Sequence, residues 1–346
     1  EPFLPVGTVI AREQTYVHPF FKKEVVRMDP AKVDEVFSQV VFSGDDFKAT
    51  FDKQSGLLTS YIYKKQEYIH NGQGPQPFFW RAPTDNDYGA KLPTRLKAWR
   101  EASYQTPKAE SFNVSKDGDK SIVKVTYRFP QVDAQWEITY KVFANGIIKV
   151  DNRFVAEGTE TPMIPRVGLR MQLSEILNDL TYYGRGPEEN YRDRRTSQFI
   201  GEYTTPIKDL YEPYIRPQEN EHRTDIYWCA LTTKQKAGLL FIADRTFELN
   251  ASNYLLGSLD SGETIDNGAP RTNETNHRHL TDPQPVKQVD MFIDYRMMGV
   301  GGDNSWGAIA HEPYLIRPGV ENAIEYGFSI VPFDKKADYK NLIYQY

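Results

Sequence analysis

Cysteine is almost absent from this 346-residue sequence, whose single thiol is Cys229. No disulfide can therefore form within the chain, and a four-cysteine zinc site is excluded. Cys229 lies inside the apolar run IYWCALTT, which predicts a buried core thiol rather than a reactive one.

Excess positive charge and long apolar runs are also missing. The 42 Lys and Arg residues are outnumbered by 47 Asp and Glu, for a formal net charge of -5. We therefore expect no binding to nucleic acid, which needs clustered cations to displace counterions. No apolar run approaches the ~18 residues that predict a membrane span. The N-terminus EPFLPVGTVIAREQ lacks both an initiator Met and the features of a signal peptide, so we expect that a preceding segment has been removed.

The signatures of several enzyme and metal-binding classes are absent as well. The stretches GVGGDN and GRGPEE contain glycines, but neither has the full G-x-G-x-x-G spacing of a nucleotide site. There is no G-x-S-x-G, H-E-x-x-H or G-x-x-x-x-G-K-[ST] motif. The segment DNDYGAKLPTRL begins like a calcium loop. However, Ala90 stands where the sharp-turn Gly is required, and Leu96 stands where the bidentate Glu belongs.

What the sequence does contain is a period of two. In AQWEITYKVF, Trp136, Ile138 and Tyr140 face one side while the polar residues between them face the other. The pair Asn145-Gly146 then predicts a hairpin with a type I′ turn, because this turn needs positive φ at both central positions. The same alternation recurs in SIVKVTYRF, VGLRMQL, VDMFIDYRM and AIEYGFSIV. We expect half-buried antiparallel strands with one wet face.

Helical signals are few. DPAKVDEVF offers Asp29 as an N-cap and Pro30 at the first helical position, and TRLKAWREA predicts a short helix that buries Leu96 and Trp99. Many strands and few helices indicate a large all-β sandwich. We place a domain boundary near residue 40, since the residues before it read as an irregular lead-in.

Two clusters of ionisable residues have both a structural and a functional interpretation. His277 and His279 share one face if their segment is a strand, which suits a metal site or structural hydrogen bonding. Glu188 and Glu189 are adjacent carboxylates that could serve acid–base chemistry. The favoured interpretation is a charged loop held by ion pairs, whose arginines are Arg185, Arg192, Arg194 and Arg195.

Trp306 stands near the end of the glycine-rich stretch MGVGGDNSWG, and its flanking residues are Gly, Asp, Asn, Ser and Gly, so it has no adjacent apolar residue. An indole on such a loop can stack on the C–H face of a sugar, anchor a partner, or fold back onto the core. The stretch RAPTDNDYG combines a Pro-fixed turn with short polar side chains that bond readily to backbone. Its composition alone favours a structural role.

Taken in order, RAPTDNDYG, GRGPEENYRDR, YIRPQENEHR, NHRHL and MGVGGDNSWG resemble the C-terminal part of bacterial β-galactosidases of glycoside hydrolase family 2. The resemblance covers residues 41–346, the small-chain domain (domain 5), and residues 1–40 resemble the end of a preceding immunoglobulin-like domain with its linker. Two positions depart from the usual pattern: Glu221 stands where Gly is common, and Asn304 where Asp is common.

The resemblance implies an all-β fold, a large antiparallel super-sandwich of the galactose-mutarotase-like type with few short helices. It also implies that the catalytic Glu pair lies on a preceding TIM barrel, since this sequence has no βα alternation to form one. The chain by itself is therefore expected to carry no catalytic residue and to be inactive. Mg²⁺ (or Ca²⁺) and Na⁺ sites are likewise expected in the other domains, with none in this chain.

For the site residues, the resemblance implies that Trp306 stacks on substrate, with Asp303 and Asn304 beside it. A second segment borders the same active site and consists of Asp85, Asn86, Asp87 and Gly89, with Gly89 as its mobile point. The expected partners are a β-galactoside such as lactose, the remaining domains of the same enzyme, and further copies in a homo-oligomer. The expected location is the cytoplasm or periplasm of a bacterium.

Two alternatives stay open. The chain could be a stand-alone galactoside-binding module, which requires binding of galactose without the barrel. It could also be an aldose-1-epimerase-like enzyme, which needs a histidine acid and a carboxylate base in one cleft. The histidines that could supply the acid are His222, His277 and His279.

Overall fold

The structure is a computed structural model of the chain. It describes residues 4–5, 7–15, 29–118, 120–157, 162–260, 264–266, 269–271, 279–304, 306–319 and 323–345.

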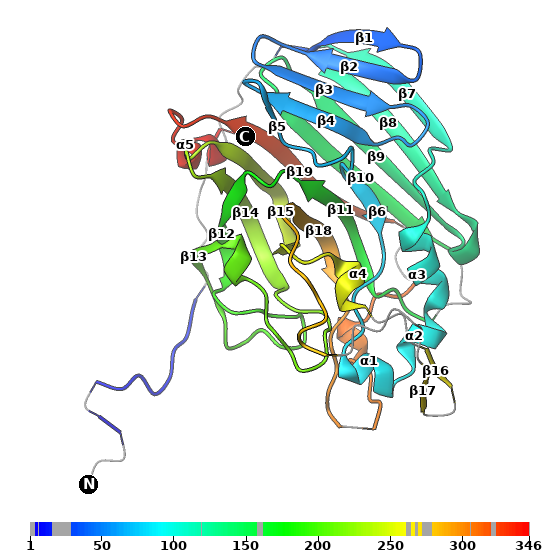
Figure 1. The fold of residues 1–346 in the computed structure, drawn as a ribbon, viewed down its shortest axis with the longest axis vertical. Coiled ribbons are helices and arrows are strands. Elements are labelled where there is room, and N and C mark those ends of the chain that lie inside the picture. The colour runs from blue at the N-terminus through cyan, green and yellow to red at the C-terminus, as the bar shows by residue number, and fades with distance from the viewer. Residues whose placement is uncertain are drawn as a thin grey trace.

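Within these residues the chain forms two main sheets (Figure 1), and every strand pair is antiparallel. The smaller sheet follows chain order: β1 Lys32–Val36, β2 Gln39–Ser43, β3 Phe47–Asp52, β4 Leu58–Tyr63 and β5 Gln66–Glu67. It packs on the larger sheet, where the Phe51 ring lies 5.0 Å from the ring of Tyr140.

The larger sheet has a main path and a branch. The path runs β13 Phe199–Pro206, β12 Leu177–Gly186, β14 Arg223–Thr233, β15 Gly238–Ser252, β19 Ile324–Phe333, β10 Ile148–Ala156, β9 Ala134–Val142, β8 Lys120–Phe129 and β7 Ser111–Asp117. The branch leaves β15 through β18 Val289–Met297, β11 Arg166–Leu173 and β6 Gln76–Phe78. A separate pair is formed by β16 Thr264–Asp266 and β17 Ala269–Arg271.

The helices of the described residues are short: α1 Asp85–Gly89, α2 Leu92–Arg95, α3 Lys97–Tyr104, α4 Leu256–Leu259 and α5 Tyr339–Ile343. None of the helices in the described ranges is long and apolar enough to cross a membrane. The prediction of an all-β antiparallel fold with few short helices is confirmed. Figure 1 shows α1, α2 and α3 together at one end of the sheets, beside the segment around residue 300.

The strand pattern is confirmed most clearly in β9, where buried and half-buried residues alternate along the whole strand. Strand β10 returns beside it, so the predicted hairpin is also confirmed. The predicted type I′ turn is wrong. Gly146 has φ +89°, whereas Asn145 is not in the left-handed region, and the amide of Gly146 donates to the carbonyl of Phe143. This geometry needs positive φ at one position only.

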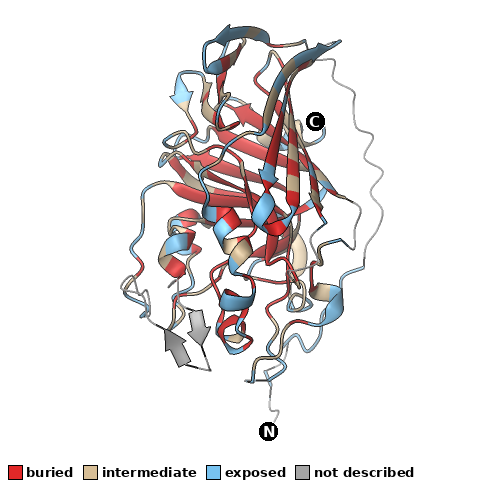
Figure 2. Cartoon of the chain, turned by 90° about the vertical axis from the view of Figure 1, so that its right-hand side faces the viewer, coloured by how far each residue is buried: buried red, intermediate tan, exposed pale blue. Residues whose placement is uncertain are grey.

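The expectation that each strand has one solvent-exposed face is wrong for the central strands. In β11 and β18 nearly every residue is buried, and Figure 2 shows buried residues along the strands in the middle of the molecule. Most of the charged residues of β11 and β18 are therefore buried too, and Arg170 donates to both oxygens of Asp290, over 2.8 and 2.9 Å. Cys229 is buried in the core, as predicted.

One of the two predicted helices is present. Leu96 precedes α3 and Trp99 lies within it, and both are fully buried. The helix predicted for residues 29–37 is wrong, since residues 32–36 form strand β1, paired with β2. Of the apolar stripe of this segment, Val33 packs against the core whereas Val36 and Phe37 are exposed, and the backbone amides pair with β2. The sheet includes residues on both sides of residue 40, and the assignment of residues 1–40 to a preceding domain stays a prediction.

Candidate functional site

The segment that includes Asp85 begins as a helix because its first residues cap it. The Thr84 hydroxyl accepts from the amide of Asp87 (3.2 Å), and the Asp87 carboxylate accepts from the amide of Thr84 (3.0 Å). This capping box satisfies two amides that a helix start leaves without partners. The segment predicted as a loop is therefore the one-turn helix α1.

The structure brings α1 and the Trp306 loop, defined here as residues 298–307, into contact. The Asn86 side-chain amide donates to the carbonyl of Val300 over 3.1 Å. Gly89 and Gly307 face each other so closely that a Cβ on Gly307 would lie 2.5 Å from the carbonyl oxygen of Gly89. The two segments that the resemblance places at one active site therefore form one continuous surface.

The tip of the Trp306 loop projects into solvent. The side chain of Trp306 is 91% exposed, and its amide donates to Oδ1 of Asn304 over 2.8 Å. Asp303 is exposed, and its carboxylate is hydrogen-bonded with Nε2 of His311. Positive φ angles at Gly301, Gly302 and Gly307 let the chain turn sharply on both sides of the tip.

The two aspartates of α1 have different surroundings. Asp85 is exposed and exchanges hydrogen bonds with Gln218, whose amide nitrogen lies 3.2 Å from the carboxylate. Asp87 is 5% exposed and accepts two hydrogen bonds, of 2.9 and 2.8 Å, from the buried guanidinium of Arg81. Asp87 therefore supports α1 from inside, while Asp85 and Asn86 lie on the side of the neighbouring loops.

The charged loop around residues 182–195 is held by ion pairs, as predicted. Arg185 and Arg195 both pair with Asp225. Arg192 pairs with Glu248, and Arg194 pairs with Glu189. Glu189 also accepts from the amide of Glu221 over 2.9 Å. These contacts commit Glu189 to structure, so Glu188 and Glu189 do not form a pair of free carboxylates.

Glu221, one of the two departures from the usual pattern, has φ +60°. This left-handed conformation favours glycine and strains other residues. The Glu221 carboxylate pairs with the buried Arg223 over 2.7 Å. The departure from Gly therefore places an ion-paired side chain at a position whose backbone conformation suits glycine.

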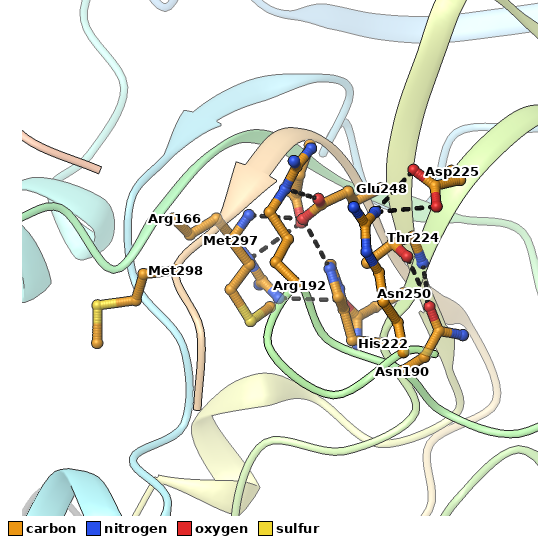
Figure 3. Close-up of polar contacts among 12 residues, drawn as sticks. Arg166, Asn190, Arg192, His222, Thr224, Asp225, Glu248, Asn250, Met297 and Met298 are labelled. Atoms are coloured by element: carbon orange, nitrogen blue, oxygen red, sulfur yellow. Dashed lines mark hydrogen bonds and ion pairs between the residues drawn. The ribbon is translucent and has the colours of Figure 1, made fainter. Parts of the chain in front are cut away.

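A buried polar network, which the sequence did not predict, lies beneath the charged loop (Figure 3). Glu248 accepts from Nε of Arg192 (2.5 Å) and from the amide of Met297 (2.7 Å), and lies 2.9 Å from Nε2 of His222. Burial opposes ionisation of Glu248, but the hydrogen bond with His222 and the cation of Arg192 outweigh it and lower its pKa. The other ring nitrogen of His222 lies 2.7 Å from Oδ1 of Asn250.

The sequence pattern gives no signal for this network, because polar residues that alternate with apolar ones are equally typical of a solvent-exposed strand face. Glu248 and Asn250 alternate with buried apolar residues in TFELNAS of β15. Asp294 is a second example, and its side chain is fully buried against Arg166, 3.2 Å away. Burial raises the pKa of Asp294 to about 7, against the opposing effect of the Arg166 cation.

The epimerase alternative needs a histidine and a carboxylate in an open cleft. His222 and Glu248 are close enough, but their side chains are 1% and 2% exposed, so no sugar can reach them. The His311–Asp303 pair is exposed on a projecting loop instead. His279 is exposed beside Asp282, and His277 lies outside the described residues.

Metal binding by the described residues finds no support: no group of three or more His, Cys, Asp or Glu side chains among them could hold an ion. Burial raises the pKa of the Cys229 thiol well above its usual range, which favours the unreactive neutral form.

The described strands and loops define an antiparallel, β-rich chain whose Trp306 loop carries an exposed indole, and comparisons with known proteins assign its family. Residues 43–330 match the family model described as the β-galactosidase small chain. The chain therefore belongs to the β-galactosidase small-chain family.

Relatives named β-galactosidase cover most of this chain. That of Priestia megaterium is 33% identical over 284 residues, which are 82% of this chain and 26% of the relative. That of Streptococcus thermophilus is 29% identical over 316 residues, or 90% of this chain and 29% of the relative. The chain thus spans less than a third of the length of these relatives. Among solved structures, the galactose 1-epimerase of Lactobacillus acidophilus gives a TM-score of 0.49 at 7% identity, over 88% of this chain and 99% of that chain.

Proposed function

We propose that this chain is the C-terminal part of a β-galactosidase, an enzyme that hydrolyses terminal β-galactosides such as lactose with retention of configuration. In this proposal the chain supplies substrate-positioning loops rather than the reacting groups. The observation that carries the proposal is the 91% exposed Trp306, which projects from a loop held firmly at its base. Family membership and the short coverage of longer relatives support it.

Retaining hydrolysis needs two carboxyl groups about 5 Å apart, one as acid and base and one as nucleophile. Three carboxylates near the candidate site are engaged by arginines: Asp87 by Arg81, Glu189 by Arg194, and Glu248 by Arg192. The described sheets are antiparallel and provide no parallel strands for a TIM barrel. We therefore assign the reacting carboxylates to a barrel elsewhere in a longer protein.

Within this proposal, Trp306 reaches the mouth of that barrel and stacks on the substrate, chiefly on its aglycone side. A well-packed aromatic contact of this kind contributes about 1–3 kcal/mol. Asp303 lies beside it and is available to a sugar hydroxyl when its pairing with His311 opens. Asn304 acts mainly by fixing the backbone of Trp306, since its Oδ1 accepts from that amide.

The remaining expectations belong to the same proposal. Mg²⁺ (or Ca²⁺) and Na⁺ are bound by the other domains of the longer enzyme. The exposed loops around α1 dock onto the barrel, and the full enzyme is a homo-oligomer in the cytoplasm or periplasm of a bacterium.

The test compares the 346-residue chain with the longer protein that contains it. Hydrolysis of a chromogenic β-galactoside is expected from the longer protein alone, and turnover by the repurified chain would contradict our placement of the carboxylates. Titration of the chain with galactose, followed by calorimetry, addresses the binding-module alternative. We expect no saturable heat, because Trp306 offers one stacking surface and no enclosing pocket.

A further inference from the structure

The base of the Trp306 loop is held by side chains from two distant segments. On its carbonyl side, Arg81 donates to the carbonyls of Met298 (2.7 Å) and Gly299 (3.1 Å), and Asn86 donates to that of Val300 (3.1 Å). Three consecutive carbonyls are thus bound by the segment that forms α1. Arg81 is 2% exposed and is itself fixed by Asp87, so it holds this side of the loop base rigidly.

On its amide side, the loop is bound by Asp193. One carboxylate oxygen accepts from the amide of Val300 (3.0 Å), and the other accepts from the amide of Gly301 (2.8 Å). Hydrogen bonds from amides to a charged carboxylate are among the stronger ones in proteins. Gly299 makes this approach possible, because a Cβ there would lie 2.5 Å from the carboxylate of Asp193.

Arg81, Asn86 and Asp193 together form a clamp on the loop base, and this clamp ends just before the tip. Beyond Gly301 the chain turns through Gly302, and the tip residues Asp303 and Trp306 are exposed. The direction of the indole is therefore set by where the clamp holds residues 298–301. Asp193 is half-buried and binds backbone that leads directly to this tip, whereas Arg81 also belongs to the core beneath α1.

We propose that Asp193 is a positioning residue for the glycosidase reaction, and that it acts through Trp306 by fixing the amides of Val300 and Gly301. The inference rests on the proposed function of Trp306. Asp193 does not touch the substrate. Its loss frees the base of the loop and lets the indole move away from the position in which it stacks.

The first test uses the longer β-galactosidase with Asp193→Ala, Trp306→Ala and the double variant. Because the indole contributes binding rather than a reacting group, we expect Asp193→Ala to raise KM about tenfold with kcat nearly unchanged. That split is the mark of lost binding rather than lost chemistry. In the Trp306→Ala background, Asp193→Ala should change KM by no more than about twofold.

Two further variants make the test specific. Asp193→Asn retains one accepting oxygen and should fall between the wild type and Asp193→Ala. Asp151→Ala is the matched control, because Asp151 is also a half-buried carboxylate but lies on β10, where it pairs with Lys141 of β9 and Lys149 of β10. It should leave KM within about twofold of the wild type.

The second test measures hydrogen exchange in peptides that contain Val300 and Gly301. Faster exchange in Asp193→Ala, with an unchanged thermal midpoint within about 2 °C, supports the clamp. Unchanged exchange in Asp193→Ala overturns the inference. It is also overturned if Asp193→Ala raises KM by the same factor in the Trp306→Ala background as in the wild type. If Trp306→Ala itself leaves KM unchanged, the proposed function of Trp306 fails. If Trp306→Ala raises KM and Asp193→Ala does not, this inference alone fails.

Discussion

Alanine substitutions at two glycines that face each other should differ in their effect on stability: Gly307→Ala should destabilise the chain, and Gly89→Ala should leave its stability nearly unchanged. Gly307 has φ +93°, and a Cβ there would lie 2.5 and 2.8 Å from the carbonyl oxygen and carbon of Gly89 and 3.2 Å from the amide nitrogen of Ala90. These are backbone atoms, which cannot rotate away. A Cβ on Gly89 would meet the nearest atom of Gly307 at 3.4 Å, an ordinary contact.

The magnitude follows from these contacts. The left-handed backbone costs an alanine about 1–2 kcal/mol, and the overlap with backbone adds about 1–3 kcal/mol, so Gly307→Ala should lose about 2–5 kcal/mol. With an unfolding entropy of about 2.1 cal/mol/K per residue, this corresponds to a fall of about 3–7 °C in thermal midpoint. Gly89→Ala places a better helix former at the last residue of α1 and should stay within about 1 °C.

The assay is thermal unfolding of the 346-residue chain, followed by circular dichroism, with hydrogen exchange of residues 298–307 as the local readout. Gly307→Ala should accelerate exchange in the Trp306 loop, because part of the strain is relieved by separation of the loop from α1. Equal midpoints and equal exchange for the two variants would refute the contact between α1 and the loop. Gly89→Ala is the control that separates the overlap from the mere addition of a methyl group.

Two further predictions concern buried charge. Because burial raises the pKa of Asp294 to about 7, the folded state retains a proton that an unfolded Asp releases near pH 4. The free energy of unfolding should therefore fall by about 1.4 kcal/mol per pH unit between these values. Asp294→Asn should remove this slope in urea midpoints, and parallel pH profiles would contradict the shift. Arg170→Ala leaves Asp290 buried without its cation and should lower the free energy of unfolding by about 3–5 kcal/mol. Lys97→Ala, the control, breaks an exposed pair and should lower it by at most about 0.5 kcal/mol. Similar losses for the two variants in denaturant unfolding would refute this reasoning.

Local patterns in the sequence predicted much of the fold. The alternation in β9 and the stripe of Leu96 and Trp99 are properties of neighbouring residues, so they could be identified without tertiary information. Strand β1 could not, because its valines suit a helix stripe as well as a strand, and pairing with β2 decided between them. The burial of both faces of β11 depends on what packs over it, which periodicity does not report.

The candidate site was predicted in part. The motifs that contain Asp85 and Trp306 were expected to border one site, and the structure brings their segments into contact. The roles of Arg81 and Asp193 could not be predicted, because each binds backbone more than 100 positions away in the chain. The buried network around Glu248 likewise depends on contacts between distant segments. Whether Trp306 contacts substrate stays a prediction.

The central claim is that Trp306 positions substrate for carboxylates that lie outside this chain. The most direct test is the ratio kcat/KM for a chromogenic β-galactoside, measured on the longer enzyme with Trp306→Ala. A loss of about 1–3 kcal/mol predicts a fall of about 5- to 150-fold. Trp306→Phe should recover part of it, and Tyr344→Ala, at another exposed aromatic residue, should have no effect. An unchanged kcat/KM in Trp306→Ala would contradict the account.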